Sequence, residues 1–416
     1  MSISSHGPQV TIIGAGIIGI NIALQLQKAG LSTLIIDKGA PAAGCSSGNA
    51  GVIGVYAVTP VSMPGLWKQV PKMLFDPMGP LTIRWQHLFS IAPWLIKFLR
   101  AGKIKEVEKS AAALSSLVSS SFTSYQQLLK GTGLESLLVP SDLLAVYPSK
   151  EHFERDHYAW DLRKRHGLKW SVLKNKELHE KEPALAENYK YAVAIKGSGF
   201  VVDPKYFTYA LFEEYIKNGG QFQQVKVNSI KNNQGQAILQ TSQGFIKTNK
   251  LVIAMGAFSA ALTKCLGEPV PLQQERGYHI TLTEYKGITP KHAIISPQHK
   301  VIATPMQCGL RIAGMVEFGG FLPPNYKRSE VLKQQLQELF PSIQEEQSTS
   351  WMGHRPTLPD SLPVIDQSKT CPAVYYAFGH QHVGLTSGPA TARLVAQLIT
   401  EQELSTDITP FSLKRF

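Results

Sequence analysis

The segment Val10–Asp37 constrains the fold of this chain more than any other. Its pattern predicts a buried strand, a glycine turn, a helix over Ile17–Lys28 and a second strand that ends in Asp37. The turn has the spacing GxGxxG, formed by Gly14, Gly16 and Gly19. A strand, turn and helix of this kind predict a dinucleotide site.

Each part of this segment has a chemical reason. The first glycine permits a tight turn, the second admits a pyrophosphate close to the backbone, and the third lets helix and strand pack closely. The helix N-terminus directs N–H groups and a positive dipole end at the phosphates. Asp37 is placed to bind a ribose hydroxyl and would repel a 2′-phosphate. The segment alone leaves NAD and FAD open, and an ordinary strand-to-helix turn is the structural alternative.

Bulk properties narrow the class of protein. At 416 residues, the chain is long enough for two domains or for one large domain with a discontinuous partner. A net charge of +12 is compatible with nucleic acid, an anionic membrane surface or an acidic substrate. The four isolated cysteines predict no metal site and a reducing compartment, which we take to be the cytoplasm. The N-terminal sequence predicts no signal peptide, and no apolar run is long enough to span a membrane.

The segment Leu66–Lys105 mixes basic and aromatic side chains and contains one acid, Asp76. Its basic residues are Lys68, Lys72, Arg84, Lys97, Arg100, Lys103 and Lys105, and its aromatic residues are Trp67, Phe75, Trp85, Phe89, Trp94 and Phe98. This mixture is typical of contact with anionic lipid headgroups, so it predicts peripheral contact with the inner face of the cytoplasmic membrane. The alternative is an ordinary surface helix over Ile91–Leu99, packed on its own domain.

Two later segments also contain a predicted strand that is followed by a glycine turn. A helix over Val201–Asn218 and several strands lead to the apolar run Lys250–Gly256, which we interpret as a second strand approaching the cofactor. An ordinary glycine turn is the alternative there. Near the C-terminus, Arg355 lies among turn-forming residues, and a strand, the turn GHQHVGLT and a final helix follow. This last unit again directs helix N–H groups toward a ligand.

Five motifs occur in the order found in the D-amino acid oxidase superfamily of flavoproteins: GAGIIG, GCSSGNAG, LVIAMGAF, GHRPTLPDSLPVI and GHQHVGLTSGPAT. Nearly the whole chain resembles this superfamily and is most similar to bacterial D-amino acid dehydrogenases. The resemblance implies an α/β fold, with a Rossmann-like FAD-binding domain and a discontinuous α+β substrate domain built on a mostly antiparallel sheet. The expected FAD-binding domain covers residues 1–62, 200–266 and 350–416, and the expected substrate domain covers 63–199 and 267–349.

The resemblance also implies non-covalently bound FAD. The residues that match FAD-contacting positions of the family are Gly14, Gly16, Ile17, Ile18, Gly19, Asp37, Lys38, Ser46, Ser47, Asn49, Ala50, Gly51, Val227, Ala254, Gly256, Gly379, Gly384, Leu385 and Thr386. The loop from Ser46 to Gly51 would run along the flavin, Val227 would contact adenine, and Gly379–Thr386 would meet the pyrimidine end. Backbone N–H groups there would stabilise the reduced ring.

Two residues are assigned to the reaction by the same resemblance, and two histidines are assigned to it by their chemistry. Arg355 would bind the substrate carboxylate, which suits its forked guanidinium. Tyr278 would contact the substrate over the flavin. His380 or His382 would accept the ammonium proton, with an imidazole pKa of about 6.5.

The predicted reaction is hydride transfer from Cα of a D-amino acid to flavin N5, which leaves an imine that water hydrolyses to a 2-oxo acid and ammonia. D-proline or cis-4-hydroxy-D-proline would give a ring imine, and GHRPTLPDSLPVI and ERGYHI resemble the hydroxyproline-directed branch. Electrons would pass to a quinone or a carrier. Arg311 would either reach the substrate or pair with Glu317.

Two other functions stay open. One is a glycine or sarcosine type of oxidase that uses oxygen. The other is a tRNA-directed flavoprotein, which the net charge permits. Because no segment resembles an RNA-binding fold, we expect no nucleic acid partner.

Overall fold

A computed structural model describes residues 8–68, 70, 79–320 and 322–416. These residues form two compact units. The first contains the chain up to Ser47 together with Lys205–Gln273 and Arg355–Phe416, and the second contains Gly48–Pro204 and Gln274–His354. Residues 1–7, on which the signal-peptide prediction depends, and Lys72, Phe75 and Asp76 of the basic segment lie outside the described residues.

The first unit contains a six-stranded sheet in the order β10-β2-β1-β14-β21-β20. Its strands are β1 (Val10–Ile13), β2 (Thr33–Asp37), β10 (Gln221–Gln224), β14 (Leu251–Ile253), β20 (Val364–Gln367) and β21 (Val374–Phe378). All neighbours are parallel except β20 and β21. The short central strands are apolar and buried, as expected for a parallel sheet covered on both faces.

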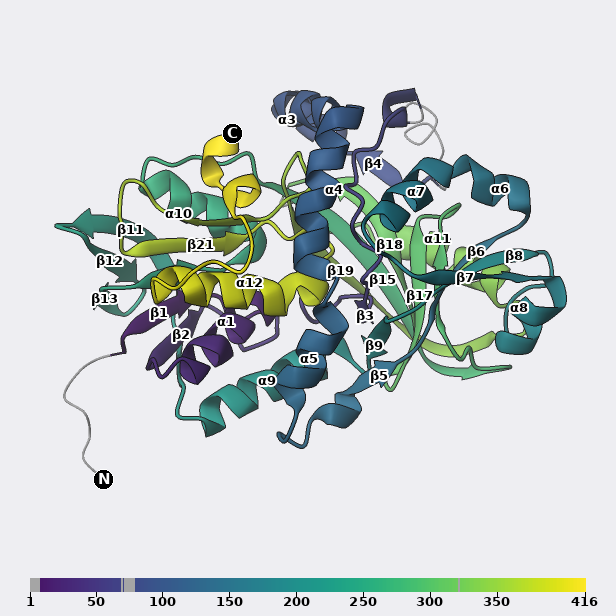
Figure 1. Cartoon of the computed structure of the whole chain (residues 1–416), viewed down its shortest axis with the longest axis horizontal. Helices are drawn as coiled ribbons and strands as arrows, with labels where there is room; N and C mark the ends of the chain where they lie inside the picture. Colours follow the sequence, from purple (N-terminus) through teal and green to yellow (C-terminus); the bar gives the residue numbers. More distant parts are fainter. Residues whose placement is uncertain (1–7, 69, 71–78, 321) are drawn as a thin grey trace. The chain divides into compact units, whose positions relative to one another are not determined.

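Helices cover this sheet. They are α1 (Ile17–Lys28), α9 (Pro204–Lys217), α10 (Ser259–Cys265) and α12 (Gly384–Ile399). The helices α1 and α12, from opposite ends of the chain, pack side by side (Figure 1). A separate antiparallel sheet consists of β11 (Val227–Asn233), β12 (Gln236–Thr241) and β13 (Gly244–Thr248). The predicted Rossmann-like domain is confirmed.

The second unit contains a nine-stranded sheet in the order β19-β15-β18-β17-β16-β6-β8-β7, with β4 paired to β18. Its strands are β4 (Leu81–Ile83), β6 (Leu143–Tyr147), β7 (Trp170–Lys174), β8 (Tyr191–Ile195), β15 (Gln273–Lys286), β16 (Ala293–Ser296), β17 (Val301–Met306), β18 (Gly309–Phe318) and β19 (Gln344–Thr357). The pairs β16–β6 and β18–β4 are parallel, and the sheet is otherwise mostly antiparallel, as predicted.

Smaller elements complete the second unit. A three-stranded sheet consists of β3 (Val52–Ile53), β9 (Gly199–Val201) and β5 (Leu138–Pro140). The helices are α3 (Leu88–Ala101), α4 (Ile104–Val118), α5 (Ser121–Leu129), α6 (Lys150–Arg155), α7 (His157–Arg165), α8 (Asn175–Lys181) and α11 (Lys327–Leu339).

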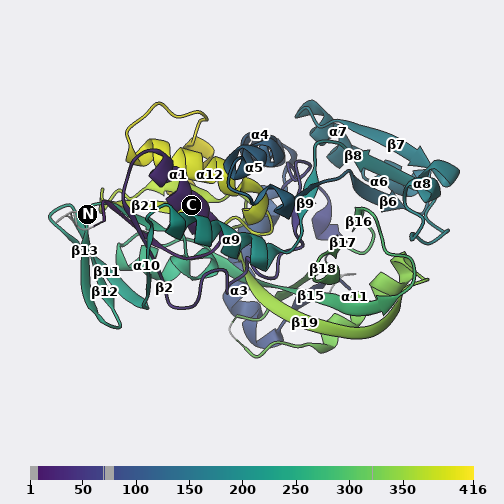
Figure 2. The same ribbon diagram turned by 90° about the horizontal axis from the view of Figure 1, so that it is seen from below.

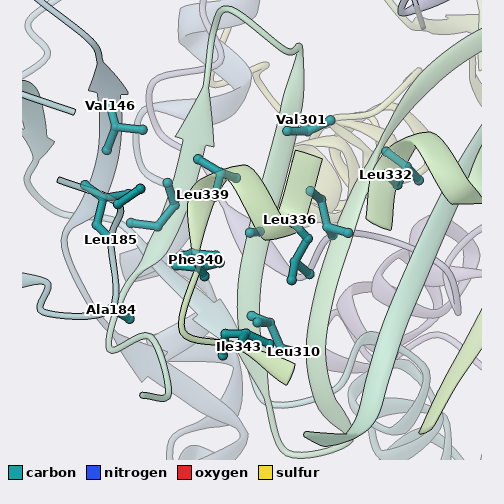
Figure 3. Close-up of a cluster of buried hydrophobic side chains, with 14 of the residues drawn as sticks. Val146, Ala184, Leu185, Val301, Leu310, Leu332, Leu336, Leu339, Phe340 and Ile343 are labelled. Atoms are coloured by element: carbon teal, nitrogen blue, oxygen red, sulfur yellow. The ribbon is translucent and has the colours of Figure 1, made fainter. Parts of the chain in front are cut away.

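The two faces of the large sheet differ in polarity near α11. This helix lies against the sheet (Figure 2), and its leucines pack with apolar strand residues such as Leu310 (Figure 3). Tyr278, Ile280 and Leu282 of β15 belong to this apolar cluster. Since successive side chains of a strand point to opposite faces, the residues between them point to the other face. This alternation divides the side chains of β15 between an apolar face and a polar face.

Candidate functional site

The glycine turn of the first unit leaves no space for a side chain at two positions. Gly14 has a φ of +119°, and a Cβ there would lie 2.3 Å from the carbonyl oxygen of Ala254. A Cβ at Gly19 would lie 1.9 Å from the carbonyl oxygen of Gly14. The helix α1 therefore packs directly on the turn, and the chain that follows β14 lies beside it.

Asp37 braces the same turn from the end of β2. Its two carboxylate oxygens accept hydrogen bonds from the N–H groups of Ala15 (2.8 Å) and Gly39 (2.9 Å). Each carboxylate oxygen has a second lone pair, so the side chain retains capacity to accept a ribose hydroxyl. The ribose contact remains a prediction, and the bracing role is one that the sequence did not indicate.

The N-terminus of α1 has the donor groups that a phosphate site needs. Gly16 is the N-cap and supplies no side chain, and the first turn contains no acidic residue. The Ser46 hydroxyl accepts a hydrogen bond from the Ile17 N–H (2.9 Å). A Cβ at Gly16 would lie 3.2 Å from this hydroxyl. Ile18 and Gly19 continue the first turn, so bare backbone and the positive dipole end lie together, which fits a pyrophosphate.

The other residues of the first unit that are expected near FAD follow the carboxyl ends of strands of the parallel sheet. Lys38 follows β2, and its ammonium lies 4.0 Å from the centre of the Phe258 ring. Val227 is buried at the start of β11. Ala254 follows β14, and Gly256 beyond it has a φ of +55°. Because β2, β10 and β14 are parallel, their carboxyl ends share one edge of the sheet, where ligands of open α/β sheets bind.

The two C-terminal motifs are hydrogen-bonded to each other. The Gln381 N–H donates to the Pro356 carbonyl (3.0 Å), and the Gln381 side-chain amide donates to the Leu358 carbonyl (3.1 Å). Arg355 is half-buried near the end of β19, directly before Pro356. The structure therefore brings the strand that carries Arg355 next to the loop Gly379–Thr386.

This loop ends in a second helix N-terminus. Gly379 has a φ of +87°, and a Cβ there would lie 2.4 Å from the Leu358 side chain. The helix α12 begins at Gly384 with no acidic residue in its first turn and no side-chain cap. Leu385 and Thr386 are buried in this turn. As at α1, the helix end favours a negative charge.

Tyr278, the predicted substrate contact, is tied to buried groups of the second unit. It is buried within the apolar cluster of the second unit, and its hydroxyl donates to Glu317 and accepts from the Asn325 N–H (3.1 Å). Glu317 also pairs with Arg84 and Arg276. The Tyr278 hydroxyl is thus part of a buried ion-pair cluster, and the contact of Tyr278 with the substrate stays a prediction.

On the face of the sheet opposite Tyr278, a row of polar side chains crosses β15, β18 and β17. Thr281 is paired in register with Arg311, and Arg311 is paired with Thr304. His279 lies two residues from Thr281 on the same face, and its ring stacks on Trp351, with centroids 5.1 Å apart. We call this set the polar row: His279, Thr281, Thr304 and Arg311. The sequence analysis missed His279, Thr304 and Trp351, although alternation along β15 places His279 on the face opposite Tyr278.

The loop from Ser46 to Gly51, which we expect to run along the flavin, begins in the first unit and ends in the second. Ser47 ends the first segment of the first unit, and its hydroxyl donates to the Gly44 carbonyl (2.8 Å). In the second unit, the carbonyls of Gly48, Asn49 and Ala50 accept hydrogen bonds from the polar row. Gly51, with a φ of +75°, leads from this loop into β3.

Residues 9–398 match the DAO family, described as FAD dependent oxidoreductases. This chain belongs to that family. Among its relatives, the D-amino-acid oxidase of Bradyrhizobium diazoefficiens is 36% identical over 420 residues, with 99% of each chain covered. The D-amino acid dehydrogenase of Rhizobium rhizogenes is 26% identical, with 98% of this chain and 100% of that protein covered. Glycine oxidase from Geobacillus kaustophilus has the same fold, with a TM-score of 0.75, 22% identity and coverage of 99% and 100%.

Membership of the DAO family confirms the predicted cofactor and enzyme class: the protein is an FAD-dependent oxidoreductase. The chain fits this cofactor on its own geometry. At Gly14 and Gly19 the packing excludes a Cβ, and the N-terminus of α1 offers backbone donors with no acidic residue in its first turn. These features suit the pyrophosphate of FAD.

The two loop histidines of this DAO-family member differ in environment. His380 is buried, and its Nε2 forms a hydrogen bond with the Thr391 hydroxyl (3.0 Å). Burial lowers the pKa of His380 to about 3. A histidine with this pKa is neutral at pH 7, so the expectation of an ordinary imidazole pKa of about 6.5 does not hold for His380. Its role as acceptor of the ammonium proton stays a prediction. His382 is exposed on the same loop.

Arg311 is buried and belongs to the polar row. Its Nε donates to the Thr281 hydroxyl (3.0 Å), and a terminal nitrogen donates to the Asn49 carbonyl (2.8 Å). Glu317 is paired with Arg84 and Arg276 instead. The pairing of Arg311 with Glu317 was therefore the wrong alternative. A register shift between β15 and β18 lies between the two positions.

The helix α3 presents an apolar surface as well as a packed face. Its buried side chains are Ile91 and Trp94. Its exposed apolar side chains are Leu88, Phe89, Ile96 and Leu99, of which Phe89 is 90% exposed. Lys97 and Arg100 are exposed on the same helix. Within the described ranges, no helix is long and apolar enough to cross a membrane.

Proposed function

We propose that this protein oxidises D-amino acids to imines, which water hydrolyses to 2-oxo acids and ammonia. One observation carries the proposal: hydrogen bonds join the strand of Arg355 to the loop Gly379–Thr386. A cation suited to a carboxylate and a helix N-terminus suited to negative charge thus lie in one part of the first unit. The names of the relatives that are 36% and 26% identical support the same substrate class.

The chain's own residues supply binding and orientation. Arg355 pairs its two terminal N–H groups with the two carboxylate oxygens, which fixes Cα of the substrate. When bound, FAD accepts the hydride that leaves Cα. The N–H groups at the start of α12 are suited to a group with negative charge, such as a reduced flavin would carry there.

A proton must leave the substrate ammonium before the amine can assist hydride loss. We assign this proton to His382 or to solvent, because His380 is buried with a lowered pKa. His382 lies one residue after Gln381, which is held by Pro356 and Leu358. It therefore lies on the loop that adjoins the strand of Arg355.

Two finer proposals concern the substrate and the electron acceptor. A D-amino acid with a primary amine gives an open imine, whereas D-proline or cis-4-hydroxy-D-proline gives a ring imine. We propose a quinone or an electron carrier as acceptor. Oxygen is the second candidate, because the relative that is 36% identical is named an oxidase.

Anaerobic mixing with a substrate panel tests the proposal. Bleaching of the flavin absorbance is followed with D-alanine, D-proline, cis-4-hydroxy-D-proline, glycine and sarcosine. We expect bleaching by at least one chiral D-amino acid, faster than by glycine or sarcosine. Reoxidation by air or by a quinone analogue then identifies the acceptor, and rapid hydrogen peroxide formation would exclude the dehydrogenase proposal. Bleaching by glycine or sarcosine alone would indicate the alternative oxidase.

We also propose that the exposed surface of α3 contacts anionic lipid. Phe89 is 90% exposed, Ile96 is 51% exposed, and Lys97 and Arg100 supply positive charge beside them. Apolar insertion and headgroup attraction would act together. The fraction of protein that floats with phosphatidylserine vesicles should be smaller for the variant Phe89→Ser. The control is Phe245→Ser, a change at another exposed phenylalanine, and it should not alter this fraction. Equal flotation of both variants and the unmodified protein would contradict the proposal.

A further inference from the structure

The loop Gly48–Gly51 is held by its own carbonyl groups. Three successive carbonyls accept side-chain hydrogen bonds: Gly48 from Nδ1 of His279 (3.0 Å), Asn49 from Arg311 (2.8 Å) and Ala50 from the Thr304 hydroxyl (2.8 Å). The fourth carbonyl, of Gly51, accepts a hydrogen bond from a backbone N–H (2.8 Å). Every carbonyl of this short loop therefore accepts a hydrogen bond from another part of the second unit.

The donors come from three neighbouring strands, in the order β15, β18 and β17. Thr281, Arg311 and Thr304 form one in-register row, and His279 lies on the same face of β15. The sheet thus presents donors at fixed spacing. A strand face is more rigid than a surface loop, so it is a precise template for the loop backbone.

The His279 contact fixes the chemistry of that side chain. A carbonyl only accepts hydrogen bonds, so Nδ1 of His279 must carry a proton. Burial and the nearby Arg311 charge lower the pKa of His279 to about 3. The ring is therefore neutral at pH 7, with the proton on Nδ1, and it stacks on Trp351.

Arg311 is the central member of the row. It is 6% exposed, and its partners include the Thr281 hydroxyl, the Asn49 carbonyl and the Cys308 sulfur (3.7 Å). Asp203 lies close enough to interact electrostatically with the guanidinium. Burying a cation is costly, and it is tolerated only where several groups are bonded to it. The planar guanidinium suits this arrangement better than a lysine ammonium.

We propose that Arg311, assisted by His279 and Thr304, is a positioning residue that holds the loop Gly48–Gly51 in its FAD-binding shape before the cofactor arrives. This inference rests on the proposed contact between the loop and the flavin. Gly51 adds a second constraint, because its φ is +75° and a Cβ there would lie 2.7 Å from the Met306 side chain. A loop ordered in advance binds with a smaller loss of conformational entropy.

Three variants and one control test this role. Arg311→Met removes the charge and the donors, Arg311→Lys keeps the charge, and Thr304→Val removes one donor at nearly constant shape. The control is Arg165→Met, at an exposed arginine of α7. For each, the FAD-free protein is prepared, the Kd for FAD is measured by titration, and amide exchange of residues 48–51 is compared.

We expect the Kd for FAD to rise about 30-fold in Arg311→Met and about fivefold in Thr304→Val. The Kd of Arg311→Lys should lie between the values of Arg311→Met and the unmodified protein. Amide exchange of the loop should accelerate in the same order, and Arg165→Met should change neither quantity. Unchanged Kd and unchanged loop exchange in folded Arg311→Met would overturn the inference. If Arg311→Met does not fold, Thr304→Val decides in the same way.

These readouts need no amino acid substrate. If no D-amino acid bleaches the flavin but the Kd and exchange results are as expected, the proposed reaction fails and the positioning role stands. If bleaching occurs but the Kd values do not change, the positioning role fails and the proposed reaction stands.

Discussion

The hydroxyl of Tyr278 donates a hydrogen bond to the carboxylate of Glu317 on the neighbouring strand. Burial alone would raise the pKa of Glu317, but this hydrogen bond and the charges of Arg84 and Arg276 hold it below its ordinary value. The cluster is therefore ionised and connects β15, β18 and the chain beside β4. A tyrosine in this position supports the fold of the second unit.

Removing that hydroxyl should affect stability more than turnover. In Tyr278→Phe, Glu317 loses one donor, so we expect the free energy of unfolding to fall by about 1–3 kcal/mol. The KM and kcat for a D-amino acid should change less than twofold, because the hydroxyl is already bonded to Glu317 and to the Asn325 N–H. Urea denaturation and steady-state kinetics measure the two effects. A tenfold rise in KM without loss of stability would instead indicate that Tyr278 contacts the substrate.

Arg355→Lys and Arg355→Met test the carboxylate contact. A lysine retains the charge but cannot form the paired hydrogen bonds, so we expect kcat/KM to fall about tenfold in Arg355→Lys and about 100-fold or more in Arg355→Met. Most of the change should appear in KM. The matched control is Arg165→Met, whose kinetics should equal those of the unmodified protein. Equal kcat/KM in all three variants would remove Arg355 from the site.

Gly14→Ala tests the glycine turn against Gly30→Ala. Both glycines have positive φ, +119° and +81°, but a Cβ at Gly14 meets the Ala254 carbonyl at 2.3 Å, whereas nothing lies within 4 Å of a Cβ at Gly30. Gly30→Ala should cost about 1 kcal/mol and leave FAD binding intact. Gly14→Ala should lose stability and should also bind FAD more weakly. The two variants would contradict this account if their Kd values for FAD were the same.

The buried histidines predict a loss of stability in mild acid. The folded-state pKa of His380 is about 3, below the ordinary value of 6.5, so the unfolded chain binds more protons between pH 3 and pH 6.5. Stability is therefore lost as the pH falls through this window. His279 acts in the same direction. At pH 5, each of the two histidines should lower the free energy of unfolding by about 2 kcal/mol.

Denaturation at pH 7.5 and pH 5.0 measures this effect. The variant His380→Asn should lose less stability between the two pH values than the unmodified protein, by about 2 kcal/mol. Phe245→Ser provides the control, since this change at an exposed phenylalanine removes no titratable group and should keep the original pH dependence. The same pH dependence in all three proteins would show that His380 does not resist protonation in the folded state.

Much of the fold could be predicted because its signals are local. The helix α1 spans Ile17–Lys28, as the sequence predicts, since the glycine turn fixes its start. The predicted helix Val201–Asn218 begins at Pro204 instead and ends at Lys217. Family membership and FAD also follow from motifs that can be read directly in the chain.

The features that could not be predicted have one physical origin, namely packing between segments far apart in sequence. Period-two alternation divides β15 into two faces, but it does not say that α11 covers the face of Tyr278. Likewise, the GHQH motif does not reveal that His380 is buried against Thr391 of α12. The polar row was missed because His279, Arg311 and Thr304 belong to three strands and meet only in the folded sheet.

The most direct test of the central claim is anaerobic flavin bleaching by the two enantiomers of one amino acid. Alanine is used first, and then proline, with the unmodified holoenzyme and with Arg355→Met. We predict rapid bleaching by the D-enantiomer, none by the L-enantiomer on the same timescale, and at least 100-fold slower bleaching of Arg355→Met at low substrate concentration. Equal bleaching by both enantiomers, or bleaching that does not depend on Arg355, would contradict the account.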